Sequence, residues 1–315
     1  MNLYICNLSA LWFYSMVTTS LDDVSKPCTK TSVSDAASAL SEIRAFDLTE
    51  LDFGRGALLV LVGDATSRSK AASVKYHVRS CELPLGAFRK LDVGIFLASP
   101  ELCFYELACS LPLLKLVEFG YLLCGTYTLN PAAKVKNDRK PLTTKRRLES
   151  FALRMSDKRG QAAVLEALSL VHEGSASPRE TKLAMLLTFP VRLGGYRFEA
   201  PILNYRIDFT KTEQELFGKP HVELDLYWPE RHCGVEYDGG ENHSESDDVS
   251  RDRKKSSELN CRGITVVRVD KQQLSTPYQV YILARKLEKL MKIRHRKPSD
   301  AQWQRKEELF ELIMR

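Results

Sequence analysis

At 315 residues the chain is long enough to form two domains, each with its own buried core. Apolar residues make up 44% and charged residues 27% of the sequence, which is typical of a folded globular protein and excludes a disordered chain. The formal net charge of +6 favours the approach of a polyanion such as nucleic acid, but so modest an excess does not identify a partner.

The eight cysteines include no C-x-x-C pair, and several lie in apolar runs such as ELCFYELAC. This usage predicts neither a zinc site nor a disulfide framework, and it is typical of buried thiols in a cytoplasmic protein. The apolar stretch LYICNLSALWFYSMV lacks the charged flank and the small-residue cleavage site of a signal peptide. No uninterrupted apolar run approaches the roughly 20 residues of a membrane span, so we expect no membrane partner.

In chain order, the first half begins with a strand and continues with helices. The aliphatic run at 57–64 predicts a buried strand. Residues 99–125 predict one or two apolar helices, because a serine and a proline stand at their start and Gly120 and Gly125 are candidate stops. This half contains no glycine-rich phosphate loop, no triad spacing and no metal-ligand cluster, so it reads as a small α/β domain of unknown purpose.

A basic segment at 131–147 interrupts the apolar periodicity and adds prolines and paired threonines. We place the domain boundary here, which divides the chain into an N-terminal domain at 1–147 and a C-terminal domain at 148–315. The segment is either a solvated linker or a contact for DNA, and its composition favours the linker.

The second half alternates helices and strands, which predicts an α/β sandwich around a mixed sheet. The expected helices and strands, in order, are helices at 161–173 and 178–188, an extended stretch at 196–209, strands at 222–228 and 233–238, a basic helix at 247–261, a strand at 263–269 and a closing pair of helices rich in Lys and Arg.

Two acidic residues stand out in the strands at 222–228 and 233–238. Alternation along VELDLYW places Asp225 on the face opposite Leu224, and alternation along GVEYD places Glu236 and Asp238 together. A symmetric turn centred between Glu230 and Arg231 would bring Asp225 directly opposite Glu236, with Cβ atoms about 5 Å apart.

Two carboxylates at that distance repel each other unless something compensates for the charge. One group can take a proton, an Arg or Lys can bridge the pair, or a divalent cation can bind between them. Mg²⁺ suits a few hard carboxylate ligands that leave positions for water and phosphate. A solvated acidic strand pair at the edge of a sheet is the alternative, and spacing alone does not decide between the two.

These residues carry a family resemblance. Asp225, then Glu236-Tyr237-Asp238-Gly239, then His243 resemble the PD-(D/E)XK nuclease superfamily, in particular its branch of very-short-patch-repair endonucleases. A helix with Asp252 and Lys255, or Asp248 and Arg251 in another register, and the strand Gly263-Ile264-Thr265-Val266-Val267-Arg268 continue the resemblance over about 175–270.

The resemblance implies a restriction-endonuclease-like sandwich in which Asp225 and Glu236 bind Mg²⁺ or Mn²⁺. It implies that Glu180, on the first helix, helps to organise the metal site, and that Asp238 also assists there. The sequence Ser177-Pro178-Arg179-Glu180 is also a capping box. The alternative is therefore that Glu180 caps the helix and has no part in the site. Asp208 is a rival for the role of Asp225, although its distance from Glu236 would require a long insertion.

One departure from the superfamily pattern concerns the basic residue. The motif has a lysine two residues after the glutamate, where this chain has Asp238. Lys255 or Arg251 of the following helix is the expected replacement. His243 falls one residue later than the pattern; it either contacts phosphate and transfers protons or is a loop histidine without a role.

Two functions follow as expectations. The first is a metal-dependent endonuclease that hydrolyses phosphodiester bonds of DNA, with RNA as a second candidate substrate and a homodimer as a candidate assembly. The second is an inactive nuclease fold that binds DNA as a regulator, since the N-terminal half faintly resembles the antitoxin-like regulators of abortive-infection systems. The basic run at 292–297 would contact phosphates, unless it is a frayed, solvated helix end.

Overall fold

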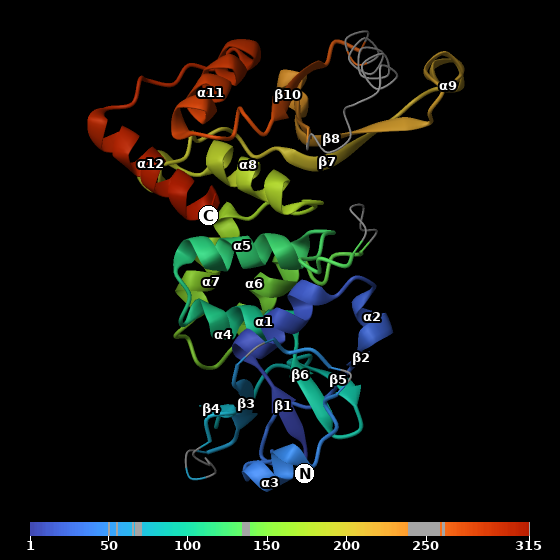
Figure 1. Cartoon of the computed structure of the whole chain (residues 1–315), viewed down its shortest axis with the longest axis vertical. Helices are drawn as coiled ribbons and strands as arrows, with labels where there is room; N and C mark the ends of the chain where they lie inside the picture. The colour runs from blue at the N-terminus through green and yellow to red at the C-terminus, as the bar shows by residue number, and fades with distance from the viewer. Residues whose placement is uncertain are drawn as a thin grey trace. The chain divides into compact units, whose positions relative to one another are not determined.

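The computed structural model describes residues 1–49, 51–54, 56–64, 66, 71–133, 139–238, 259 and 262–314. The chain divides into two compact units, Met1–Glu173 (unit 1) and Gly174–Arg315 (unit 2) (Figure 1). Both units combine helices with a mixed sheet, as expected of an α/β protein.

Unit 1 is built on a sheet with the strand order β2-β5-β6-β1-β3-β4. Its strands are β1 (Leu3–Ile5), β2 (Lys26–Pro27), β3 (Leu58–Val62), β4 (Val74–Val78), β5 (Phe88–Asp92) and β6 (Ile95–Ala98). The interior strand β1 is buried along its whole length. β3 lies within the aliphatic run at 57–64, which was expected to form a buried strand, and its second half is buried. β1 pairs in parallel with β6 and antiparallel with β3, so the sheet is mixed.

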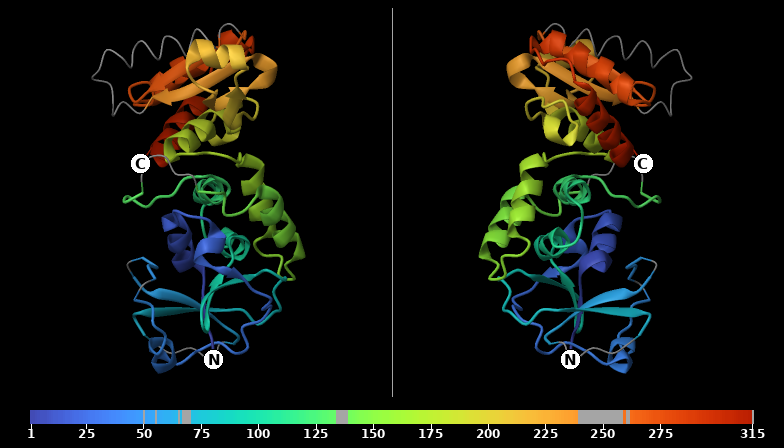
Figure 2. Two further views of the ribbon diagram at one scale, coloured as in Figure 1. Left: turned by 90° about the vertical axis from the view of Figure 1, so that its right-hand side faces the viewer. Right: turned by 90° about the vertical axis from the view of Figure 1, so that its left-hand side faces the viewer.

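Most helices of unit 1 gather on one side of this sheet, whereas the short helix α3 (Leu40–Arg44) lies on its other side (Figures 1 and 2). The helices of unit 1 are α1 (Asn7–Met16), α2 (Leu21–Val24), α3 (Leu40–Arg44), α4 (Pro100–Ala108), α5 (Leu113–Cys124), α6 (Lys145–Arg154) and α7 (Gln161–Leu170). The stretch at 99–125 forms two helices, as one of the sequence alternatives predicted. Gly125 ends α5, whereas Gly120 lies inside it, where a Cβ atom would come 2.7 Å from Val171. Gly120 therefore permits close packing and does not stop the helix.

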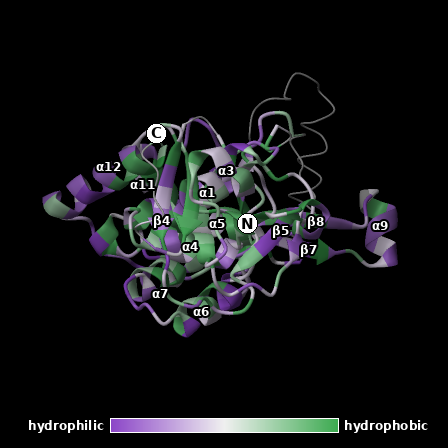
Figure 3. Ribbon diagram, turned by 90° about the horizontal axis from the view of Figure 1, so that it is seen from below, coloured by the Kyte–Doolittle hydropathy of each residue, from purple (hydrophilic) through white to green (hydrophobic). Residues whose placement is uncertain are grey.

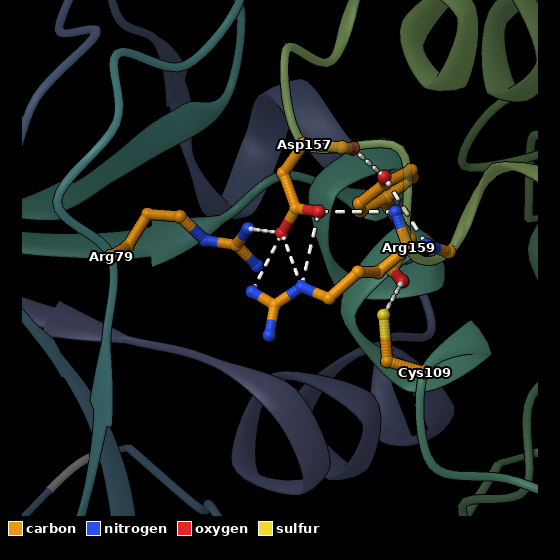
Figure 4. Close-up of polar contacts among 6 residues, drawn as sticks. Arg79, Cys109, Asp157 and Arg159 are labelled. Carbon is orange, nitrogen blue, oxygen red and sulfur yellow. Dashed lines mark hydrogen bonds and ion pairs between the residues drawn. The ribbon is translucent and has the colours of Figure 1, made fainter.

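The division of the chain falls after Glu173, later than the boundary expected at 131–147. The reason is that α6 and α7 pack against α4 and α5. Figure 4 shows the connection between α6 and α7, where Asp157 forms ion pairs with Arg79 at 3.2 Å and with Arg159 at 2.7 Å. The Tyr105 hydroxyl donates to the carbonyl of Asp157 and accepts the Gly160 N–H, so the connection is attached to α4.

The basic segment is also not a solvated linker throughout. Arg139 is almost completely buried in unit 1, with 1% of its surface exposed. Its guanidinium donates to the carbonyls of Tyr14 at 3.3 Å, Leu122 at 2.6 Å and Gly125 at 3.2 Å, near the ends of α1 and α5. Burial lowers the pKa of Arg139 to about 10, which leaves it charged at neutral pH. A positive charge stabilises the carbonyl ends of helices, so Arg139 joins two of them.

Unit 2 contains a sheet with the strand order β10-β9-β8-β7, in which β9 and β10 are parallel and the other pairs antiparallel. Its elements are α8 (Pro178–Thr188), η1 (Val191–Leu193), β7 (Ile202–Asp208), α9 (Lys211–Phe217), β8 (His221–Trp228), η2 (Pro229–Arg231), β9 (Cys233–Asp238), β10 (Thr265–Asp270), α11 (Pro277–Met291) and α12 (Asp300–Met314). The chain runs out along β7 to α9 and returns along β8 (Figure 1). Seen from below, α9 and α12 are largely hydrophilic, whereas α4 and α5 are mainly hydrophobic (Figure 3).

The strand, hairpin and closing-helix predictions for this unit are confirmed. β8 and β9 pair Leu226 with Val235 and Trp228 with Cys233, the register expected from a turn centred between Glu230 and Arg231. Two other expectations need correction. The helix expected at 161–173 belongs to unit 1 as α7. The segment between the extended stretch and β8, for which no helix was expected, contains α9, which a Thr-Glu capping box starts.

A carboxylate from α4 caps the start of α1 in the interior of unit 1. Glu106 Oε2 accepts the backbone N–H of Asn7 at 3.1 Å, and Asn7 itself has a left-handed φ of 50°. Burial raises the pKa of Glu106 to about 7, against the favourable charge of Arg79. The charged form is therefore costly in the native state, and unit 1 should be less stable where Glu106 is ionised.

This predicts the pH dependence of Glu106→Gln. Between about pH 4.5 and 7 native Glu106 keeps a proton that the unfolded chain has lost, so wild-type stability falls as the pH rises through this window. The neutral glutamine lacks this dependence. As the pH rises from 4.5 to 7, the free energy of unfolding of Glu106→Gln relative to wild type should therefore increase by about 3 kcal/mol. Above pH 7 the difference should stay constant. Urea unfolding at a series of pH values measures the change, and parallel curves for the two proteins would contradict it.

Candidate functional site

Asp225 and Glu236 lie at the centre of the candidate site, on β8 and β9. The paired ladder between these strands ends at Leu226 and Val235, and Asp225 and Glu236 are the next residue on each strand. The Asp225 carboxylate is directed at the neighbouring strand, because Oδ2 accepts the backbone N–H of Tyr237 at 2.6 Å. A carboxylate oxygen that accepts a backbone N–H forms a strong hydrogen bond, so this contact holds the Asp225 side chain toward β9.

The strict alternation expected along β8 fails at this point. Val222, Leu224 and Tyr227 belong to one buried cluster, although residues three apart on a regular strand face opposite sides. The tip of Leu224 lies where a Cβ atom on Gly234 would be, at 2.8 Å, so only glycine fits there. β8 therefore changes its face at Asp225. Irregularities of this kind re-aim side chains and are common beside active sites.

The neighbouring strand β7 is irregular at the same level. The pairs Leu203–Leu226 and Tyr205–Leu224 enclose Asn204 and Asp225, which places these two residues opposite each other in the ladder. Asn204 has a φ of 48°, in the left-handed region that residues other than glycine seldom adopt. Its Nδ2 donates to Glu180 Oε2 at 2.7 Å and to the carbonyl of Gly174 at 2.9 Å.

Glu180 lies in the first turn of α8 and takes part in the cap of this helix. The Ser177 hydroxyl accepts the Glu180 N–H at 3.1 Å, as in the first half of a capping box. The Glu180 carboxylate reaches further back, because Oε2 accepts the N–H of Ala176 at 2.8 Å as well as the Asn204 amide. Glu180 is 8% exposed, so α8 delivers a nearly buried carboxylate to the strand that pairs with Asp225.

On the other side of β9, the register supplies a cation. Arg268 of β10 pairs directly with Glu236, and Asp270 pairs with Asp238. Paired positions on neighbouring strands direct their side chains to the same face. The expected replacement for the missing motif lysine was a helix residue, and sequence reasoning did not assign Arg268 this role. Arg268 was part of the strand predicted from the sequence. Its place beside Glu236 follows only from the pairing of β10 with β9.

Of the other predicted residues, Asp208 is not brought to this place. His243 and Lys255 lie outside the described residues, as do the alternatives at 248, 251 and 252. Asp208 stands at the far end of β7, opposite His221, with an ion pair to Arg206 at 2.7 Å. It is four residues along the strand from Asn204, and it is not a rival for Asp225.

The basic run after α11 is ordered, in contrast to a frayed helix end. Glu288, which is 4% exposed, has its Oε1 3.0 Å from Nδ1 of His295, and the His295 ring lies edge-on to Phe198. Exposed basic side chains alternate with inward ones here, at Lys292, Arg294 and Arg296. Three cations on a backbone held in place are suited to phosphate contacts.

The donor set fits a hard divalent cation of the magnesium type. Mg²⁺ keeps several waters and needs only one or two carboxylates, which Asp225 and Glu236 can supply, while thiols and imidazoles are absent from the neighbouring described positions. Three-residue groups of His, Cys, Asp or Glu with metal-binding geometry do not occur among the described residues.

No protein-family model, curated protein or solved structure matches this chain. None of the helices in the described part of the chain is both long and apolar enough to cross a membrane.

The hydrogen bond from Tyr237 to Asp225 predicts how substitutions act on stability. Asp225→Ala leaves a backbone N–H without its acceptor and should cost about 1–3 kcal/mol, whereas Asp225→Asn keeps an acceptor oxygen and should cost less. Urea unfolding and hydrogen exchange of the Tyr237 amide measure the two effects. Glu223→Ala, on the same strand, is the matched control, and equal loss of protection in the Ala and Asn variants would refute the structural role.

Proposed function

We propose that unit 2 is a metal-dependent nuclease domain of the PD-(D/E)XK type, which hydrolyses phosphodiester bonds of DNA with Mg²⁺ or Mn²⁺. The observation that carries the proposal is the hydrogen bond from the Tyr237 N–H to Asp225 Oδ2, which directs the Asp225 carboxylate at β9, the strand that contains Glu236. The mixed sheet, with α8 ahead of it and helices after it, is compatible with a restriction-endonuclease-like sandwich.

In this proposal the residues have separate tasks. Asp225 and Glu236 bind the cation, and the hydrogen bond from Tyr237 keeps the Asp225 carboxylate aimed at β9. When bound, the cation supplies an activated water and stabilises charge on the scissile phosphate. Arg268, which pairs with Glu236, binds the scissile phosphate. It neutralises negative charge on the phosphate, the task of the lysine in the superfamily motif. Asp238, which pairs with Asp270 on β10, assists the two metal-binding carboxylates.

A DNA-binding module without catalysis is the second candidate. Asp238 in the place of the motif lysine and the exposed cations Lys292, Arg294 and Arg296 favour it. Both functions predict binding of DNA that weakens as salt rises, because cations on the protein release counterions from the phosphates. RNA as substrate and a homodimer that cuts both strands are variants of the first proposal.

The two candidates differ in a plasmid-nicking experiment with Mg²⁺ or Mn²⁺. The wild type should convert supercoiled plasmid to nicked circles, and Asp225→Asn and Glu236→Gln should abolish the conversion, because each removes a negative ligand while keeping the side-chain shape. Glu223→Gln is the matched control on the same hairpin and should cleave normally. A single-stranded RNA of equal length tests the alternative substrate.

The outcomes separate the candidates. Cleavage that survives both substitutions would rule out this active site. Binding of DNA by a wild type that cuts neither DNA nor RNA under any of these conditions would favour the regulatory module.

The role of Arg268 predicts a second set of results. Arg268→Met should lower the cleavage rate by about 100- to 1000-fold, the usual cost of losing a charge-stabilising group. Arg268→Lys should recover part of the rate, because lysine keeps the charge but not the planar fork. Lys271→Met, just beyond β10, is the matched control. Binding of DNA in Ca²⁺, measured by fluorescence anisotropy, should change far less than the rate, and an unchanged rate in Arg268→Met would refute the role.

A further inference from the structure

Asn204 adopts a conformation that needs a reason. It lies in the middle of β7 with a φ of 48°, where an L-residue is strained and glycine is the least costly choice. Asparagine tolerates this region better than most side chains, because its short amide can form local hydrogen bonds. Strain of this kind persists only where the surroundings impose it, and it is concentrated at functional sites.

The contacts of Asn204 account for both hydrogens of its amide. Both partners, Glu180 Oε2 at 2.7 Å and the Gly174 carbonyl at 2.9 Å, are acceptors, so the nitrogen of the amide must face them. Glu180 Oε2 also accepts the N–H of Ala176 at 2.8 Å. One oxygen of Glu180 is therefore committed to two donors, while no described residue donates to its other oxygen, Oε1.

The position of Asn204 connects this carboxylate to the candidate site. Asn204 is level with Asp225 between the paired residues of β7 and β8, and Asp225 accepts the N–H of Tyr237, the residue after Glu236 on β9. A left-handed residue at this level turns the amide toward α8, where Glu180 begins the helix. The strained backbone and the choice of asparagine thus serve the same contact.

We propose that Asn204 is a positioning residue that orients Glu180, so that Oε1 of Glu180 receives a water ligand of the cation held by Asp225 and Glu236. The inference rests on the proposed nuclease function and adds a residue outside the motif. Groups that orient the immediate surroundings of a metal change its affinity by about 10- to 100-fold when they are removed.

The test is direct binding of Mn²⁺ to the full chain, measured by calorimetry and by the electron paramagnetic resonance signal of free Mn²⁺. Asn204→Gly keeps the left-handed backbone at lower strain and removes only the amide, so it should fold at least as well and bind Mn²⁺ about 10- to 100-fold more weakly. Asn204→Asp places a second carboxylate against Glu180 and should weaken binding further. Glu180→Gln should weaken it to a similar degree as Asn204→Gly.

The double variant Asn204→Gly/Glu180→Gln distinguishes positioning from an independent effect. If Asn204 acts through Glu180, the double variant should bind Mn²⁺ no more weakly than Glu180→Gln alone. Additive losses, or an Asn204→Gly variant with wild-type affinity, would overturn the role of Asn204 while the nuclease proposal stands. A wild type that binds no Mn²⁺ would overturn both, and that result appears before any variant is compared.

Discussion

The hydrogen bond from the Tyr237 N–H to Asp225 Oδ2, 2.6 Å long, is the contact on which the candidate site depends. In a regular ladder the carboxylates of Asp225 and Glu236 would stand side by side and repel each other. Here one of them is turned to the backbone of β9, which satisfies part of its charge and aligns the two strands. Asn204, directly opposite Asp225 on β7, takes up the same irregularity in its left-handed backbone.

The change of face at Asp225 also explains how the sheet of unit 2 packs. At the end of the sheet that contains the start of β8 and the end of β7, Ile207, Val222 and Leu224 form a cluster with Ile264 and Leu259. On the other side of Asp225, Leu226 pairs with Val235, and both residues are fully buried. The sheet therefore buries apolar groups on both faces, and the polar residues of the site lie where the two packings meet. A site at such a junction has close-packed support on both sides.

Unit 1 shows how far composition can mislead about boundaries. The basic segment at 131–147 looks like a linker, because charge, proline and threonine interrupt its apolar pattern. Arg139 is nevertheless buried, since three backbone carbonyls replace the water that its guanidinium loses. The helices that follow stay with unit 1, because Asp157 and Tyr105 attach their connection to α4. None of these partners is near in sequence, so local patterns cannot reveal them.

Local signals determined much of unit 2. The hairpin register between β8 and β9 follows from the length of a short turn, and the strands follow from runs of β-branched and aliphatic residues. The start of α8 follows from a serine before a proline, and the alignment of Asp225 with Glu236 follows from the hairpin. The tertiary structure decided the rest: the hydrogen bonds that turn Asp225 to β9 and Asn204 to Glu180, and the pairing that brings Arg268 to Glu236. These depend on contacts between strands and a helix that are distant in the chain, and alternation along a single strand contains no information about them.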